Sequence, residues 1–99
     1  MTAARIEQSG AGRYRVSGEL TFVTVRDALG AALAQFANDS AVEVDLAAVS
    51  AADSAGLALL VEWYRWASQA KKTIRFVGAP AQLRALAKIS DIEWLLVGD

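Results

Sequence analysis

Residues 42–60 read VEVDLAAVSAADSAGLALL, and this stretch decides the fold of the chain. Its first five residues alternate apolar and acidic side chains, which is typical of a β-strand with one buried face and one face in water. After a short link, Asp53 and Ser54 precede apolar residues at helical spacing, so we expect a helix to begin there. A strand followed at once by a long helix is typical of α/β folds.

The sequence before this stretch adds two strands and a helix. Residues 13–20 alternate polar and apolar side chains and predict a strand. Gly-Ala-Gly at 10–12 predicts a turn, so a preceding strand at about 4–8 would complete a hairpin. Thr24 is a candidate N-cap for a helix that ends before Asn38. The hairpin would give the sheet an antiparallel edge.

After residue 60 the same alternation continues. The long helix is expected to reach about Gln69, and residues 73–77 predict a buried strand. Pro80 suits the first turn of a third helix, and residues 94–97 suggest a short last strand. Strands that alternate with helices imply right-handed crossovers and a partly parallel sheet. The expected fold is α/β, in a single domain of residues 1–99.

Composition excludes several classes of function. Ten Lys and Arg against eleven Asp and Glu give a net charge of −1, so no overall charge attracts nucleic acid or an anionic membrane. The absence of Cys and His removes disulfides, thiolate chemistry and the commonest zinc sites. We expect no metal. The start lacks the apolar core of a secretory signal, and no apolar run approaches about 18 residues. These features predict a cytoplasmic protein without direct membrane insertion.

Catalytic interpretations find little support in the sequence. Neither GxxxxGK[ST] nor GxGxxG occurs, so a phosphate-binding loop for ATP or a dinucleotide is missing. Ser54 has no His or Lys placed to act as its base. Asp45 and Asp53 could serve as acid and base only if they met near one strand end. We therefore expect no catalytic residue, no cofactor and no enzymatic activity.

Asp53-Ser54-Ala55-Gly56-Leu57, placed at a helix start after a strand that ends in Asp-Leu, resembles the central motif of the STAS domain. That family is named after sulphate transporters and anti-sigma factor antagonists. The resemblance extends to residues 18–20, 24–33 and 76–87, and so covers nearly the whole chain. It implies a STAS-like mixed sheet of four to five strands with helices chiefly on one face. It also implies a non-catalytic role in protein–protein interaction.

A narrower resemblance concerns residues 56–63 and 79–87, which look like the STAS subunit of Mla-type bacterial lipid-asymmetry ABC transporters. This implies a cytoplasmic subunit at the inner-membrane face that binds and supports the ATPase during phospholipid transport. The alternative is an anti-sigma factor antagonist that binds an anti-sigma factor kinase. Such antagonists more often carry Ser and Gly where Ala55 and Ala58 stand here.

The start of the long helix is the expected regulatory point. In the STAS family a Ser or Thr at the position of Ser54 is the phosphorylated residue, so Ser54 is a possible phosphorylation site. A helix N-terminus tolerates a phosphate there, whereas Asp53 would repel it. Gly56 would let another backbone approach closely. The alternative interpretation is that Asp53 and Ser54 only cap the helix.

The long helix also has more apolar surface than one contact needs. Besides a core stripe, a second apolar strip follows Leu59, Trp63, Trp66 and Ala70. This strip either packs on a neighbouring helix or stays exposed as an anchor for a partner. The candidate partner-binding or regulatory residues are Asp53, Ser54, Ala55, Gly56, Leu59, Glu62, Trp63 and Trp66.

Overall fold

Four strands form one mixed sheet in the computed structural model, which describes residues 4–96. The strands lie in the order β1 (Arg5–Gly10), β2 (Arg13–Leu20), β3 (Ala41–Ala52) and β4 (Thr73–Val77). β1 pairs antiparallel with β2, whereas β2 with β3 and β3 with β4 are parallel pairs. The predicted hairpin and partly parallel sheet are confirmed.

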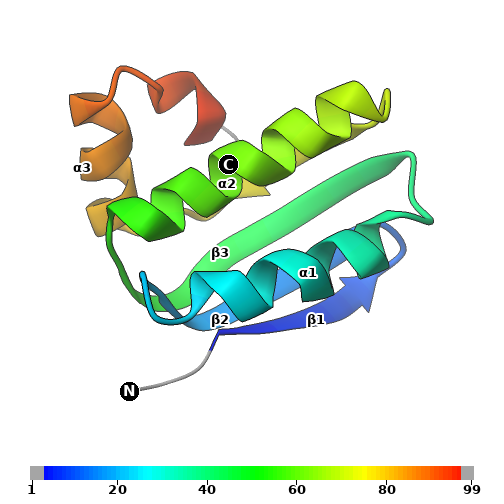
Figure 1. Cartoon of the computed structure of the whole chain (residues 1–99), viewed down its shortest axis with the longest axis horizontal. Coiled ribbons are helices and arrows are strands. Elements are labelled where there is room, and N and C mark those ends of the chain that lie inside the picture. The colour runs from blue at the N-terminus through cyan, green and yellow to red at the C-terminus, as the bar shows by residue number, and fades with distance from the viewer. Residues whose placement is uncertain (1–3, 97–99) are drawn as a thin grey trace.

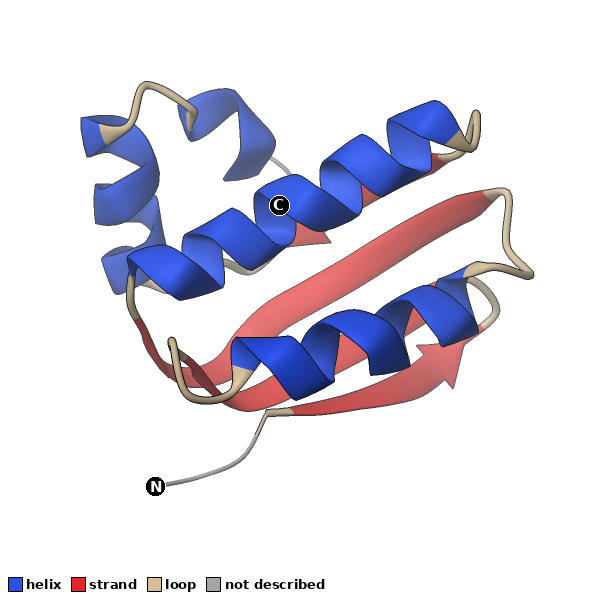
Figure 2. Ribbon diagram, viewed as in Figure 1, coloured by secondary structure: helices blue, strands red, loops and turns tan. Residues whose placement is uncertain are grey.

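Helices α1 (Val25–Phe36) and α2 (Ser54–Gln69) cover the same face of this sheet (Figure 1). Each connects two parallel neighbours, and right-handed crossovers that add strands in one direction place their helices on one side. α3 (Ala81–Ile89) and the 3₁₀ turn η1 (Glu93–Leu96) follow β4 and lie beside α2. The predicted α/β fold with helices chiefly on one face is confirmed (Figure 2).

Two predicted elements differ from the structure. Residues 94–96 belong to η1 rather than to a strand, and Val97 lies outside the described residues. The N–H of Leu95 donates to the carbonyl of Ile92, which closes a turn, and Leu95 and Leu96 are buried. A short apolar run therefore reaches the core without joining the sheet.

β3 is the second difference, because it continues through the expected link as far as Ala52. The last residues of β2 pair with residues 48–52, with an irregular register. Asp45 thus lies in the middle of β3 and Asp53 directly after its end. Eight steps of extended chain, at about 3.3 Å each, keep their carboxylates roughly 25 Å apart. An acid–base pair of Asp45 and Asp53 is therefore excluded.

An aromatic cluster fills the space between the helices and the sheet. The rings of Tyr14 and Phe36 meet edge to face at 5.0 Å, and Phe36 meets Trp63 at 5.5 Å. Trp63 also stacks on Phe76 at 6.4 Å between centroids and is 0% exposed. The Tyr14 hydroxyl donates to the Asp39 carboxylate, and burial together with this carboxylate raises the pKa of Tyr14 to about 12. Trp63 is therefore part of the core.

The opposite face of the sheet carries charges of alternating sign. The register places Glu43 between Arg13 and Arg75, and Asp45 beside Arg15. Opposite charges on neighbouring strands stabilise a solvated sheet face weakly, and Arg13 lies 3.9 Å from Glu43. This face thus has its charges balanced within itself. Among residues 4–96, no helix has the length and apolar character needed to cross a membrane.

Candidate partner-binding site

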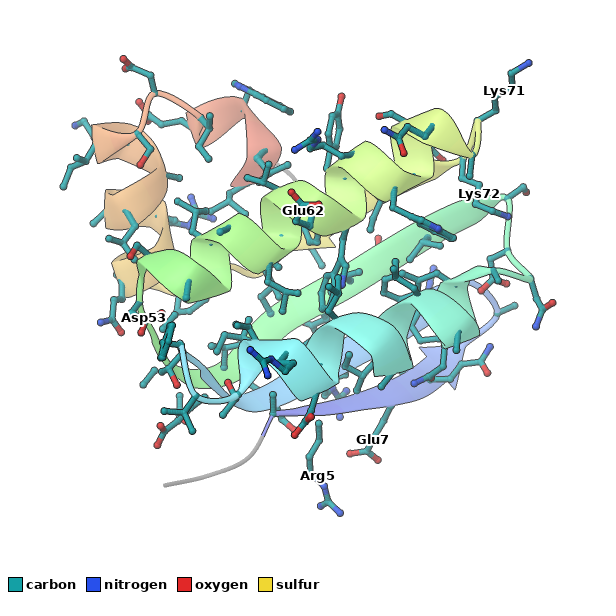
Figure 3. The ribbon with its side chains drawn as sticks, viewed as in Figure 1. Arg5, Glu7, Asp53, Glu62, Lys71 and Lys72 are labelled. Carbon is teal, nitrogen blue, oxygen red and sulfur yellow. The ribbon has the colours of Figure 1, made fainter. Side chains whose placement is uncertain are left out.

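Asp53 organises the start of α2 with both oxygens of its carboxylate. Oδ1 accepts hydrogen bonds from the N–H groups of Ala55 at 2.9 Å and Gly56 at 3.2 Å, which caps the helix. Oδ2 accepts from the N–H of Phe22 at 3.1 Å, in the loop between β2 and α1. Asp53 therefore joins the helix start to a neighbouring loop (Figure 3).

Ser54 occupies the first helical position of α2 and is exposed. Asp53 supplies the cap, so the hydroxyl of Ser54 is not needed for it. Within the described part of the chain, that hydroxyl makes no hydrogen bond. Ser54 is thus free for contact or modification, at a helix end where N–H donors and the helix dipole favour negative charge.

Gly56 seats α2 on the end of β2. A Cβ at this position would lie 2.2 Å from the carbonyl oxygen of Leu20 and 2.9 Å from the Leu20 Cβ. Only a residue without a side chain permits this approach. Gly56 is buried, so its part in the site is to hold the helix start in place rather than to touch a partner.

The loop between β2 and α1 presents two large apolar side chains to solvent. Phe22 is 81% exposed and Val23 is 63% exposed. Thr24 stabilises the loop, since its hydroxyl donates to the carbonyl of Glu19 at 2.6 Å and accepts from the N–H of Thr21 at 3.0 Å. The prediction that Thr24 caps α1 was wrong for its side chain, which bonds backward into the loop.

An open hollow of roughly 370 Å³ lies between the first halves of α1 and α2. It is lined by Val25, Arg26, Leu29, Ala55, Ala58, Leu59 and Glu62. Leu59 is almost fully buried, whereas Ala58 is exposed. We call this hollow, together with Phe22 and Val23, the α1/α2 surface. It is an apolar area with one cation and one anion in its lining, next to Ser54.

The structure divides the predicted site residues into two groups. Ala55, Leu59 and Glu62 line the hollow, Asp53 and Ser54 directly precede Ala55 at the start of α2, and Gly56 is buried there. The two tryptophans lie elsewhere on the helix and do not line the hollow. Phe22, Val23 and the α1 wall of the hollow were missed by the sequence analysis. The available signal was a pair of apolar residues between a strand end and a helix start, where polar turn residues are usual.

Trp63 and Trp66 both pack against Phe36 of α1, but only Trp63 is fully buried. The sequence left open whether the apolar strip of α2 packs on a neighbouring helix or stays exposed for a partner. For Trp63 the structure shows packing on the neighbouring helix. Trp66 is half-buried, and its ring lies 6.3 Å from that of Phe36. Lys72 lies over the Trp66 ring at 6.0 Å and donates to the carbonyls of Ala37 and Asp39, beyond the end of α1. Trp63 therefore has no surface to offer a partner.

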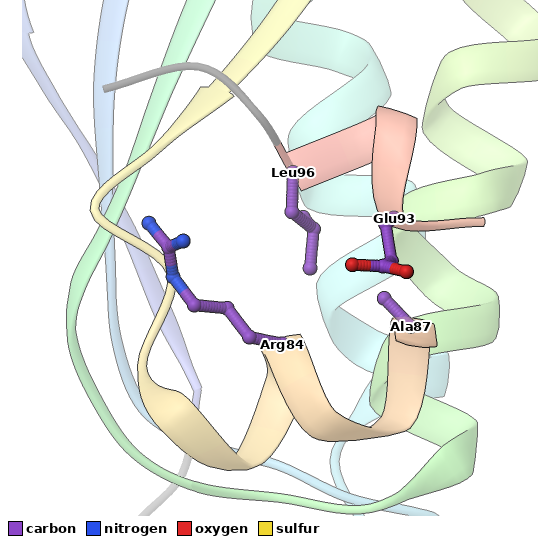
Figure 4. Close-up of a pocket in the computed structure, with 4 residues that line it drawn as sticks. All are labelled: Arg84, Ala87, Glu93 and Leu96. Carbon is purple, nitrogen blue, oxygen red and sulfur yellow. The ribbon is translucent and has the colours of Figure 1, made fainter. Parts of the chain in front are cut away.

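A second, smaller hollow of about 80 Å³ lies between α3 and η1 (Figure 4). Its polar side chains, Arg84 and Glu93, do not converge. The Arg84 Nε donates instead to the carbonyl of Ala79 at 3.0 Å. Across residues 4–96, no group of three or more acidic side chains is placed to hold a metal ion. The α1/α2 surface therefore remains the best candidate site.

Comparison with known proteins gives matches to a family model and to solved structures. The family model described as "Mlab, STAS domain" matches residues 4–98. The search of curated proteins gave no match. The structure of the anti-sigma factor antagonist SpoIIAA in its unphosphorylated form superposes with a TM-score of 0.76 at 14% identity, over 98% of this chain and 88% of that one.

Two further structures share the fold. The Bacillus cell fate determinant SpoIIAA in the phosphorylated form gives a TM-score of 0.67 at 17% identity, over 98% of this chain and 91% of that one. The murine Solute Carrier 26 anion transporter Slc26a9, in the inward-facing state, gives 0.61 at 17% identity. This chain is 95% covered in that match but spans 18% of the transporter. At sequence identities this low, the structural similarity shows a shared fold only.

Proposed function

The chain belongs to the STAS domain family, and we propose that it is a non-catalytic cytoplasmic subunit that binds the ATPase of an Mla-type phospholipid-transporting ABC complex. The description of the family model, which names Mlab, supports this choice of partner. In this role the partner performs ATP hydrolysis, and the chain contributes only a binding surface. Its place at the inner-membrane face follows from the partner.

The observation that carries the proposal is the exposed apolar area around Ser54. Phe22 and Val23 project from a loop that Asp53 holds in place, and the hollow beside them is almost entirely apolar. Large exposed apolar side chains that form one patch are typical of protein–protein interfaces. Burying a side chain such as Phe22 stabilises a complex by roughly 1.5–3 kcal/mol.

A second candidate is an anti-sigma factor antagonist that binds an anti-sigma factor kinase. One observation favours it: Ser54 is exposed at a helix N-terminus, and its hydroxyl has no hydrogen-bond partner within residues 4–96. A phosphate there would add nearly two negative charges beside Asp53. The fold is shared with the structures of SpoIIAA in its unphosphorylated and phosphorylated forms.

Binding measurements with both partners separate the two candidates. The purified chain is titrated by calorimetry with the transporter ATPase subunit, and separately with the anti-sigma factor kinase, from its own genome. We expect binding to the ATPase. Ser54→Glu should weaken it by more than about tenfold, because an unpaired charge enters a dry contact. Thermal melting of the free variant should be nearly unchanged, since acidic groups suit helix N-termini.

Ser9→Glu, on the exposed strand β1, is the matched control and should bind like wild type. Absence of ATPase binding would refute the transporter proposal. Kinase binding with phosphate transfer to Ser54 would establish the second candidate instead. Equal affinities of wild type and Ser54→Glu for a bound ATPase would remove Ser54 from the interface.

A further inference from the structure

The α1/α2 surface indicates what kind of segment the partner inserts. Resting on the proposed function, we infer that the hollow receives an amphipathic helix of the partner, with an acidic side chain placed against Arg26. Three observations support this inference: the apolar lining of the hollow, the backbone hydrogen bonding of the two helices that form its walls, and the unpaired charge of Arg26.

The walls of the hollow favour a helix over an extended segment. Both walls are helices, so their carbonyl groups along the hollow are bonded internally, and at the helix starts the N–H of Val25 donates to the Thr21 carbonyl and the N–H of Ala55 to the Asp53 carboxylate. A strand or loop seated there would lose water from its own backbone groups and find no partners, which is costly. A helix brings its backbone groups already satisfied. The apolar lining then needs only an apolar stripe to cover it.

Small residues on α2 allow a helix to approach closely. Ala55 and Ala58 are three positions apart and therefore lie on the same side of α2, one turn from each other. Leu59 forms apolar lining beside them and is nearly buried. Phe22 and Val23 stand at the end of the hollow nearest the start of α2 and would meet the end of the incoming helix.

The charged residues in the lining of the hollow favour an acidic residue on the partner. Glu62, on the α2 wall, is already paired with Arg65, whose Nη1 lies 3.2 Å from the Glu62 Oε1. Arg26, on the α1 wall, is exposed and has no ion pair among residues 4–96. It also lies in the first turn of α1, where the helix dipole disfavours a cation. A partner carboxylate would therefore find an unpaired positive charge.

The test compares two changes inside the hollow with two matched changes outside it. The probe is the purified transporter ATPase subunit, titrated at low salt. Arg26→Glu reverses the charge, and Ala58→Leu fills the hollow from an exposed helical position. Each should weaken binding by about tenfold or more. Arg75→Glu, on the opposite sheet face, and Ala34→Leu, exposed on α1, should change the affinity less than about twofold.

A crosslink identifies the inserted segment. The chain has no cysteine, so Gly30→Cys, exposed one turn along α1 from Arg26 and outside the lining of the hollow, creates a unique attachment point for a benzophenone maleimide. The crosslinked ATPase peptide should lie in a helix that carries Asp or Glu on the side facing α1. Changing that acid to Lys should restore the binding of Arg26→Glu to within about threefold of wild type, as expected for a direct charge pair.

Each outcome bears on one of the two proposals. If wild type binds the ATPase but Arg26→Glu and Ala58→Leu bind equally well, the helix inference is wrong and the proposed function stands. A crosslink to a strand or loop has the same meaning. If wild type does not bind, the proposed function fails and the inference fails with it. Self-association of the chain that Arg26→Glu abolishes would show that a second copy fills the hollow, which also overturns the inference.

Discussion

Replacing Gly56 by alanine tests how tightly α2 is seated on the sheet. The added Cβ would lie 2.2 Å from the carbonyl oxygen of Leu20, about 1 Å less than a close carbon–oxygen contact of roughly 3.3 Å. The opposing atom belongs to the backbone and cannot rotate away. The start of α2 must therefore shift by about 1 Å, which strains the bond from the Asp53 N–H to the Leu20 carbonyl, now 3.2 Å.

The expected net loss for Gly56→Ala is between about 0 and 3 kcal/mol of unfolding free energy. Overpacking of this kind typically costs about 1–3 kcal/mol and occasionally more. The better helix propensity of alanine returns at most about 1 kcal/mol. Urea unfolding followed by circular dichroism measures the loss.

Gly30→Ala is the matched control, because a Cβ there meets nothing within 4 Å and the residue is exposed in α1. It should stabilise the protein by up to about 1 kcal/mol. If Gly56→Ala proved as stable as Gly30→Ala, the close approach of α2 to β2 would be refuted, together with the role of Gly56 in the site.

Two further predictions concern the core. Trp63→Ala should lower the free energy of unfolding by about 3–5 kcal/mol, and Trp63→Phe by far less. The buried indole N–H of Trp63 has no hydrogen-bond partner within the described residues, and phenylalanine has no such group to leave unsatisfied. Equal losses for the two variants in urea melts would contradict this. Burial and Asp39 raise the pKa of Tyr14 from 10 to about 12, so the contribution of Tyr14 to stability is complete below pH 10 and is lost as pH rises toward 12. The stability difference between wild type and Tyr14→Phe should shrink over that range, and a difference independent of pH would oppose the assignment.

The parts of the fold with strong periodicity could be predicted from the sequence. Residues 42–46 alternate, the apolar stripe of α2 recurs at helical spacing, and both were predicted correctly. Residues 47–52 consist of alanine, valine and serine, without a period of two. They form a strand because β2 pairs with them, and such tertiary pairing overrides local preference.

The candidate site was predictable only in part. The residues around Ser54 have a sequence pattern typical of a helix start, so their position at the beginning of α2 was predicted correctly. The exposure of Phe22 and the burial of Trp63 depend on where α1 lies, and no local pattern gives that position. Trp63 and Trp66 share one strip in the sequence, yet only Trp63 is enclosed by Phe36 and Phe76.

The location of the α1/α2 surface follows from the topology. Two right-handed crossovers place α1 and α2 side by side on one face of the sheet, so a furrow between them is unavoidable. Along most of its length, large side chains such as Phe36 and Trp63 fill that furrow. Near Ser54 the α2 wall is made of Ala55 and Ala58, which are too small to fill it.

A hollow of about 290 Å³ at the end of the opposite sheet face has Arg13, Glu43 and Arg75 in its lining, and these charges are already balanced across the strands. The apolar area that a partner can cover therefore lies at the end of the furrow where Asp53 holds the loop of Phe22. The same carboxylate caps α2 and fixes this loop. A negative charge added at Ser54 would act on both, which supports the proposal that this end of the helix controls binding.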